Sequence, residues 1–365
     1  MTESTSDQNK ILEELSLARQ TVKTDNYSMS IGELINLYRD EEIKLDPAFQ
    51  RLFRWDDRQK TKLIESILIG IPIPEIFVAQ KSDGTWHIVD GVQRLSTILQ
   101  LVGVLSGKDA LIMTSCKYVP SLNGKLWTDL PISTQREFKK SKLKINIILT
   151  QNSDEAQYEL FQRLNTGGTS LSDQEVRNCL ILMVNPDFFK SLDDLKDYEN
   201  FKACLKLKDH KFEKEYHMEL ILRMYIGYQG DTNYSEYEPL SYTQLSDFID
   251  KETINLIKNS SIEDFVLIFK KTFDKLKNAL GEKAFVKYDM DRGDFLGAFN
   301  VSAFEMISSG IASNIDVIEN LGNEQVSEKI KSIYAVDEVQ DLLSRGKKAL
   351  VRFKGLTEFS KKYFS

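Results

Sequence analysis

The order of apolar and polar residues predicts a strand that turns directly into a helix within residues 86–102. Residues 86–89, WHIV, follow a Ser-Asp-Gly-Thr turn and are rich in strand-forming side chains. Apolar residues then recur at the i, i+3, i+4, i+7 spacing of one buried helix face, at Leu95, Ile98, Leu99 and Val102. Between strand and helix lies DGVQR, residues 90–94. A carboxylate, a glycine, an amide and a guanidinium are therefore expected to share one strand-to-helix junction.

Capping signals predict two helices upstream of this junction. Ser30 is a good N-cap for a short helix over 31–38. Asp56 and Gln59 make a capping box for a second, and Gly70 ends that helix because prolines follow shortly after it. Both helices therefore lie upstream of the strand that leads into the junction.

The strand signals predict a small sheet. Residues 77–80 are joined to 86–89 by a short turn, which indicates a hairpin, and 143–149 alternate as a third strand. The helix after the junction is expected to reach about residue 106. Ser172 with Glu175 forms another capping box, for a helix that follows a glycine-containing loop.

Beyond Pro186 strand-like runs disappear and amphipathic helices are expected, at about 212–228, 243–258, 261–280, 295–308 and 325–344. The predicted organisation is a polar lead-in (1–27), a first domain of strands and helices (28–185) and a helical domain (186–365). The fold class is α+β, because strands and helices mix in the first domain and only helices follow.

Composition limits the class of protein. A chain of 365 residues suits two domains, and 41% hydrophobic with 28% charged residues is typical of a globular, soluble protein. No apolar run reaches membrane-spanning length, the N-terminus lacks a signal-peptide core, and three scattered cysteines fit reduced thiols rather than a zinc site. We therefore expect a cytoplasmic protein without a membrane partner.

The net charge of −7 means that any DNA contact has to be local. One basic run could provide it, from Arg136 to Lys144, with Arg136, Lys139, Lys140 and Lys142 as the main candidates. The alternative is an ordinary solvated helix face, which is the usual meaning of a charge run.

The junction carries the strongest candidate chemistry. Helix N-termini favour anions, and Gly91 would let a ligand approach the backbone. Arg94 offers a planar fork suited to phosphate. Asp90 could hold a metal, a ribose hydroxyl or Arg94 itself. The alternative is that Asp90 is only an N-cap and Arg94 its salt-bridge partner.

Two further stretches offer polar groups for the same ligand. Gln50 and Arg51 stand among aromatic residues just before the second helix, where a solvated loop with an aromatic anchor is the alternative. The segment QRLNTGGTSLS, with Arg163, Asn165, Thr166 and Gly167, is rich in exposed N–H groups but lacks the Walker lysine. Its alternative is a plain connector between helices.

Histidine chemistry is not expected. The three histidines form no HExxH, Cys–His or His–Asn–His pattern, and His210 and His217, on one helix face, are interpreted as a surface pair. A nuclease of the His–Asn–His type is therefore disfavoured for this chain.

Three blocks together resemble a known family. The segment from Pro47 through SILIGIPIP, then VDGVQRLSTI, then FQRLNTGGTSLSDQEVRN is similar, in order and spacing, to the N-terminal domain of GmrSD-type modification-dependent restriction enzymes. The resemblance implies a ParB/sulfiredoxin-like core that binds and can hydrolyse a nucleoside triphosphate, in the service of restricting foreign DNA. Val92 replaces the first glutamine of the family's DGQQR motif. The nuclease domain that often follows is not recognisable after residue 185.

Two functions are expected from these features. In the first, a nucleoside triphosphatase, Asp90 positions Mg²⁺ or the attacking water, Gln93 orients water or a phosphate oxygen, and Arg94 neutralises phosphate. The remaining nucleotide-binding candidates are Gln50, Arg51, Gly91, Arg163, Asn165, Thr166 and Gly167.

The second function is a non-catalytic module, switched by nucleotide or binding DNA, that recruits a separate nuclease. The expected partners are a nucleotide, DNA, a nuclease subunit and a second copy of the chain. A third reading, a helical scaffold in which the motif only stabilises the core, is disfavoured by the three ordered blocks.

Overall fold

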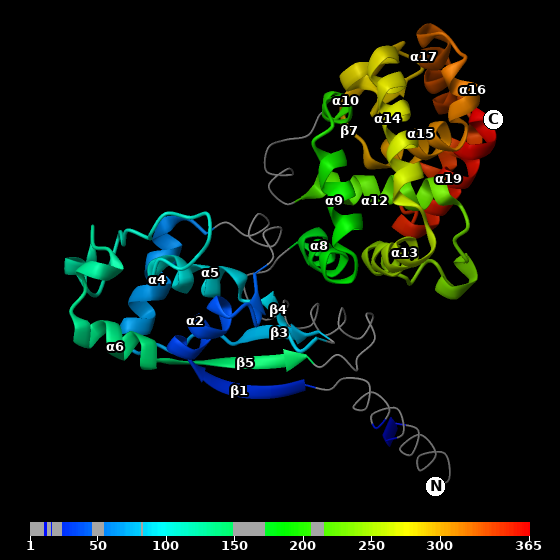
Figure 1. The fold of residues 1–365 in the computed structure, drawn as a ribbon. Coiled ribbons are helices and arrows are strands. Elements are labelled where there is room, and N and C mark those ends of the chain that lie inside the picture. Colours follow the sequence, from blue (N-terminus) through cyan, green and yellow to red (C-terminus); the bar gives the residue numbers. More distant parts are fainter. Residues whose placement is uncertain are drawn as a thin grey trace. The chain divides into compact units, whose positions relative to one another are not determined.

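The chain forms two compact units, Met1–Ser170 and Leu171–Ser365 (Figure 1). The computed structural model describes residues 11–12, 16, 24–45, 55–81, 83–148, 172–205 and 215–365. The predicted α+β class with a mainly helical second part is confirmed. In the part of the chain so described, no helix is both long and apolar enough to cross a membrane.

The first unit is built on a mixed five-stranded sheet. Its strands are β1 (Thr24–Ser30), β2 (Ile43–Lys44), β3 (Ile76–Gln80), β4 (Trp86–Asp90) and β5 (Lys142–Ile148), in the order β1-β5-β3-β4-β2. The predicted hairpin is confirmed, because β3 and β4 pair antiparallel. β1 also pairs antiparallel with β5, whereas β3–β5 and β2–β4 are parallel.

One face of this sheet is packed and the other carries polar groups. Along β5 the buried residues Leu143, Ile145 and Ile147 alternate with the exposed Lys142 and Lys144. The helices of the first unit are α2 (Ile31–Arg39), α4 (Asp57–Leu68), α5 (Val92–Leu101) and α6 (Ile132–Lys140). In Figure 1, α2, α4 and α5 lie on one side of β1 and β5. The alternation of β5 thus follows from one face being covered by helices.

The predicted caps in this unit are present. Ser30 accepts a hydrogen bond from the Glu33 backbone at the start of α2. Asp56 and Gln59 make both halves of a capping box at α4. The helix α5 ends at Leu101, five residues before the predicted end, where the chain turns through Gly103 with φ +73°. A left-handed residue here stops the helix more sharply than the apolar pattern indicated.

A buried carboxylate fastens the long segment between α5 and α6. Glu65 of α4 is 4% exposed and accepts hydrogen bonds from the backbone N–H groups of Lys117 (3.2 Å), Tyr118 (2.7 Å) and Val119 (2.8 Å). Burial by itself would raise the pKa of Glu65, but the three N–H donors and the Lys117 charge together lower it below its usual value. The irregular segment is therefore held to the helix by a charged acceptor.

The second unit is a helical bundle around an aromatic core. Its helices are α8 (Asp173–Val184), α9 (Pro186–Lys196), α10 (Glu199–Cys204), α12 (Tyr216–Gln229), α13 (Leu245–Asn259), α14 (Ile262–Ala279), α15 (Val301–Ser313), α16 (Ile315–Glu319), α17 (Asn323–Ser332), α18 (Asp337–Leu342) and α19 (Ala349–Phe364). Fully buried phenylalanines from α10, α14 and α15 pack against one another with edge-on, tilted and stacked rings, at Phe201, Phe269, Phe273 and Phe304. Such clusters supply much of the apolar burial that stabilises a bundle.

Three sequence expectations differ from the structure. The prediction that no strands follow Pro186 is wrong, because β6 (Val286–Asp289) and β7 (Asp294–Phe299) form an antiparallel hairpin. β7 occupies the first part of the segment 295–308, for which we expected a helix. Most of β7 is exposed, so its apolar pattern is weak. β1 begins at Thr24, inside the predicted lead-in. The boundary between units falls after Ser170, so α8 belongs to the second unit, where it contacts α9, α12 and α13.

Candidate functional site

Gly91 forms the hinge between β4 and α5. It is the N-cap of α5 and has φ +93° and ψ 12°, a conformation that strongly favours glycine. A Cβ atom at this position would lie 2.9 Å from Cγ1 of Ile76 and 3.2 Å from Nε of Arg94. The space beside Gly91, where we expected a ligand to approach the backbone, is therefore occupied by the side chains of Ile76 and Arg94.

Asp90 and Arg94 bind each other across this hinge. Oδ2 of Asp90 lies 2.7 Å from Nη2 of Arg94, and Oδ1 accepts the Gly91 N–H at 2.7 Å. The alternative drawn from the sequence is thus half right: the salt bridge exists, but Gly91 and not Asp90 is the N-cap. Asp90 instead stabilises the sharp turn from strand to helix, because its carboxylate accepts a hydrogen bond from the Gly91 N–H.

Among the described residues, one hydrogen-bond donor of the junction has no partner. Nη2 of Arg94 donates both to Asp90 and to the Glu75 carbonyl (3.1 Å), whereas Nε is buried with no hydrogen-bond partner among the described residues. Within the same part of the chain no side chain caps α5, in contrast to α2, α4 and α8. The first amides of α5 and the guanidinium together make this end of the helix electropositive.

Glu75 is a neighbour that the sequence did not indicate. Its carboxylate accepts a hydrogen bond from the Asn146 side chain and lies 3.3 Å from Nζ of Lys144, both on β5. The hydrogen bond from Asn146 and the charge of Lys144 lower the pKa of Glu75. Asn146 is 71 positions away in sequence, so only the parallel pairing of β3 with β5 brings the two together.

Gln93 connects the junction to the start of α4. Its Oε1 accepts the backbone N–H of Trp55 at 3.1 Å, which leaves the side-chain NH₂ group for another acceptor. Val92, where the family motif has glutamine, is 3% exposed and packs into the core. The first and second sequence blocks therefore meet in space at Trp55 and Gln93.

The other nucleotide-binding candidates, Gln50, Arg51, Arg163, Asn165, Thr166 and Gly167, lie outside the described residues. Their convergence on the junction stays a prediction.

The described end of the third block has a structural role in the second unit. Ser172 and Glu175 form the predicted capping box of α8. Arg177 is fully buried and its Nε lies 2.6 Å from Oδ1 of Asp250 on α13, with further hydrogen bonds to Gln174 and Ser246. A buried arginine needs such partners, so this part of the motif is explained by helix packing.

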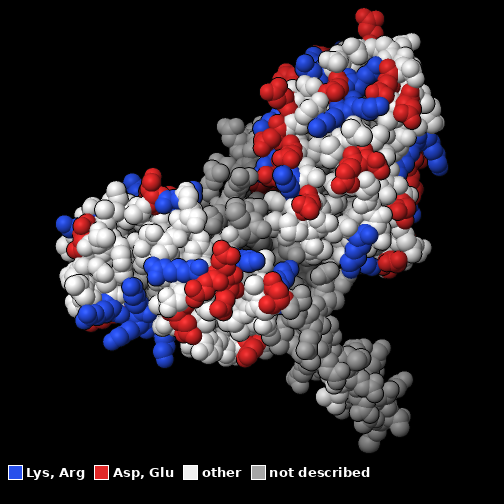
Figure 2. Space-filling view, in the orientation of Figure 1, with Lys and Arg blue, Asp and Glu red and all other residues white. Residues whose placement is uncertain are grey.

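The four basic residues that we expected to contact DNA lie in the first unit, on α6 and at the start of β5. Arg136, Lys139 and Lys140 are exposed on α6, and Lys142 is exposed at the start of β5. Figure 2 shows blue side chains gathered at the end of the first unit where α6 is found. None of these four makes a salt bridge within the described residues, whereas the nearby Lys144 is paired with Glu75. The four side chains are thus available to a phosphate backbone.

The histidine interpretation is corrected in part. His217 is not on the surface: it is 6% exposed, and burial lowers its pKa to about 4. His210 lies outside the described residues. Among the residues that the structure does describe, no group of three or more His, Cys, Asp or Glu is arranged to hold a metal ion.

The first part of the chain is similar to a known protein family. Residues 31–182 match the family model described as the GmrSD restriction endonuclease, N-terminal domain, which confirms the resemblance predicted from the three blocks. Comparison with curated proteins gave no match. Two solved structures are similar at 16% identity: the C2221 form of a Pnob8-like ParB-N domain (88% of this chain, 97% of that chain, TM-score 0.26) and a pNOB8-like ParB N-domain (94% and 98%, TM-score 0.27).

Proposed function

We propose that this chain is a component of a DNA-restriction or phage-defence system and that its first unit binds and hydrolyses a nucleoside triphosphate at the β4–α5 junction. The match of residues 31–182 to the GmrSD N-terminal domain supports the restriction role. The nucleotide role is supported by the chemistry of the junction.

One observation carries the nucleotide proposal: α5 begins without a side-chain cap beside a guanidinium whose Nε is buried and has no partner within the described part. Free amides at a helix N-terminus and an arginine together are a general solution for binding phosphate. In this proposal the phosphates lie against the first turn of α5. The Asp90 salt bridge keeps the guanidinium in place before the nucleotide arrives.

The residues present also fit a magnesium ion brought in with the nucleotide. Each carboxylate oxygen of Asp90 accepts one hydrogen bond and keeps a second lone pair. Mg²⁺ commonly takes one or two protein carboxylates and completes its shell with phosphate and water. When bound, it would neutralise phosphate charge. Asp90 would then hold the ion or the attacking water, while the side-chain NH₂ group of Gln93 would donate to a phosphate oxygen.

A non-catalytic module is the second candidate. It is favoured by the geometry of Asp90, whose two oxygens are already engaged by Gly91 and Arg94. A carboxylate in that state holds a turn well and activates water poorly. In this version the nucleotide only switches the chain, which contacts DNA through the exposed side chains of α6 and recruits a separate nuclease.

Calorimetry and phosphate release with ATP, GTP, CTP and UTP, with and without Mg²⁺, test both candidates. Arg94→Ala should weaken binding by about 2 kcal/mol, the usual value of a charge-assisted hydrogen bond. Asp90→Asn keeps an oxygen for the Gly91 N–H but removes the charge, so it should spare most of the binding and abolish turnover. Turnover that survives Asp90→Asn would favour the non-catalytic role for this residue.

A matched control is available in the same unit. Asp57 and Lys60 form an exposed ion pair on α4 with 3.1 Å between Oδ1 and Nζ. Asp57→Asn makes the same chemical change away from the junction and should alter neither binding nor turnover. If the unmutated chain binds none of the four nucleotides, and Asp90→Asn and Arg94→Ala only lower the melting temperature, the junction is purely structural and the nucleotide proposal fails.

A further inference from the structure

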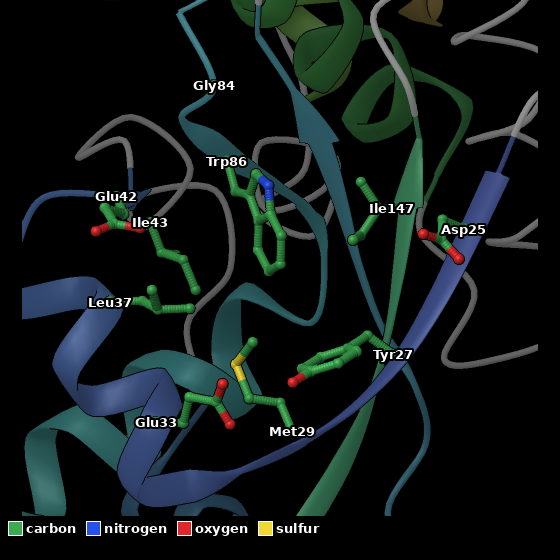
Figure 3. A pocket seen from close by; sticks show the side chains of 10 residues that line it. All are labelled: Asp25, Tyr27, Met29, Glu33, Leu37, Glu42, Ile43, Gly84, Trp86 and Ile147. Atoms are coloured by element: carbon green, nitrogen blue, oxygen red, sulfur yellow. The ribbon is translucent and has the colours of Figure 1, made fainter.

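A cavity of about 340 Å³ opens in the first unit between α2 and the strands β1, β5 and β4 (Figure 3). Its floor is apolar, formed by Met29, Leu37, Ile43 and Ile147. The sheet register explains this composition, because Asp25 pairs with Ile147 and Ile43 pairs with Trp86. Alternate residues of neighbouring strands thus point to the helix-covered face and line the same space.

Two aromatic rings border the cavity. Figure 3 shows the indole of Trp86 and the ring of Tyr27 projecting into the space above Met29, from β4 and β1 respectively. Tyr27 is 49% exposed, which is high for a side chain on the packed face of a sheet. Aromatic faces carry negative charge density and attract cations that come within about 6 Å.

The charged residues of the lining all have the same sign. Asp25, Glu33 and Glu42 stand around the cavity, and none of its lining residues is a lysine or an arginine. All three carboxylates are exposed, and no salt bridge to any of them occurs within the described residues. Three carboxylates that have no salt bridge among the described residues, placed beside aromatic rings and an apolar floor, are complementary to a cation on an aliphatic stem.

We propose that this cavity binds an alkyl ammonium or alkyl guanidinium group, with the stem on the apolar floor, the charged head near the rings, and the carboxylates holding it by charge. The same chemistry occurs in the lysine or arginine side chain of a protein and in a free polyamine. A pocket of this size holds one such side chain. The carboxylates raise the local concentration of cations, and the rings select those with a polarisable head.

The cavity is separate from the junction. Trp86 begins β4 and Asp90 ends it, so the two sites use opposite ends of this strand. Glu75 reaches Asn146, which alternates with the cavity-facing Ile147 and therefore lies on the other face of the sheet. The inference does not depend on nucleotide binding, and its failure would leave the proposed function unaffected.

Isothermal calorimetry on the full chain with matched small probes tests the proposal. Nα-acetyl-arginine amide and Nα-acetyl-lysine amide should bind, and Nα-acetyl-citrulline amide, which has the shape of arginine without its charge, should bind at least about tenfold more weakly. Spermidine forms the second arm. Tighter binding of the amino-acid amides assigns the site to a protein side chain, and tighter binding of spermidine assigns it to a free polyamine.

Exposed variants keep the test independent of folding. Glu33→Gln with Glu42→Gln should weaken binding of the arginine probe by about tenfold and reduce its dependence on salt, because two of the three charges are lost. Glu137→Gln, an exposed change on α6, is the control and should leave binding unchanged. Equal affinity for the arginine and citrulline probes, or affinity unchanged by the double variant, would overturn the proposal. So would the absence of binding by all charged probes.

Discussion

Gly91→Ala should destabilise the first unit more than an ordinary glycine replacement, because two independent costs meet at this residue. A side chain at φ +93° costs about 1–2 kcal/mol in backbone strain. The added Cβ would also lie 2.9 Å from Cγ1 of Ile76, which is fully buried in β3 and cannot move away cheaply. Overpacking of this kind costs about 1–3 kcal/mol. The expected total is about 2–5 kcal/mol.

Gly103, at the other end of α5, separates the two costs. Its φ is +73°, and nothing lies within 4 Å of an added Cβ. Gly103→Ala therefore carries the backbone strain alone and should cost about 1–2 kcal/mol. Hydrogen exchange of the α5 amides, measured across a urea series, reports the local free energy of opening for both variants.

The comparison also decides between two interpretations of Gly91. If Gly91 were needed only so that a ligand can approach, Gly91→Ala would lower nucleotide affinity while α5 stayed as stable as in Gly103→Ala. Equal destabilisation by the two variants would refute the packing argument. A larger loss at Gly91 would show that Ile76 and Arg94 require the glycine.

Three further predictions concern other parts of the chain. Glu65→Ala removes the acceptor of three backbone N–H groups, so it should cost about 3 kcal/mol and accelerate hydrogen exchange at 117–119, whereas unchanged exchange would show that the carboxylate does not hold this segment. His217 has a pKa of about 4 in the folded chain, below its value of 6.5 in the unfolded chain. As the pH falls, the unfolded chain therefore takes up the proton first, and the free energy of unfolding should decrease by up to about 3 kcal/mol between pH 6.5 and pH 4. His217→Gln should flatten that part of the pH–stability curve, and an unaltered slope would assign it to another group. Replacing Lys139, Lys140 and Lys142 by glutamate should weaken DNA binding and flatten its salt dependence, and unchanged affinity and slope would move the DNA surface away from α6.

Local signals predicted local structure well. The capping boxes of Asp56 with Gln59 and of Ser172 with Glu175 are present, because a cap is complete within four consecutive residues. The β3–β4 hairpin is present for a similar reason, since its turn is only a few residues long. In each case the residues that decide the structure are neighbours in sequence.

Long-range contacts could not be predicted in the same way. β1 has the polar sequence TDNYSMS, and it forms a strand because β5, more than 100 positions later, supplies its partner. Glu65 and Glu75 read as ordinary charged residues, yet one anchors the 117–119 backbone and the other meets Asn146. A single sequence carries no record of which distant group accepts which hydrogen bond.

The arginines in the described parts of the second and third sequence blocks have different hydrogen-bond partners. Arg177 and Arg94 both stand in polar motifs. Arg177 is fully buried with Asp250, Gln174 and Ser246 around it, whereas Arg94 has a buried Nε with no partner among the described residues. A buried arginine with partners on several of its nitrogens is sufficiently explained by packing. One that leaves a desolvated donor unpaired bears a cost of about 1–3 kcal/mol, which an anion at the uncapped start of α5 would remove. For this reason the proposed phosphate site is at Arg94, whereas helix packing accounts for Arg177, although the sequence alone indicated that both blocks belong to one site.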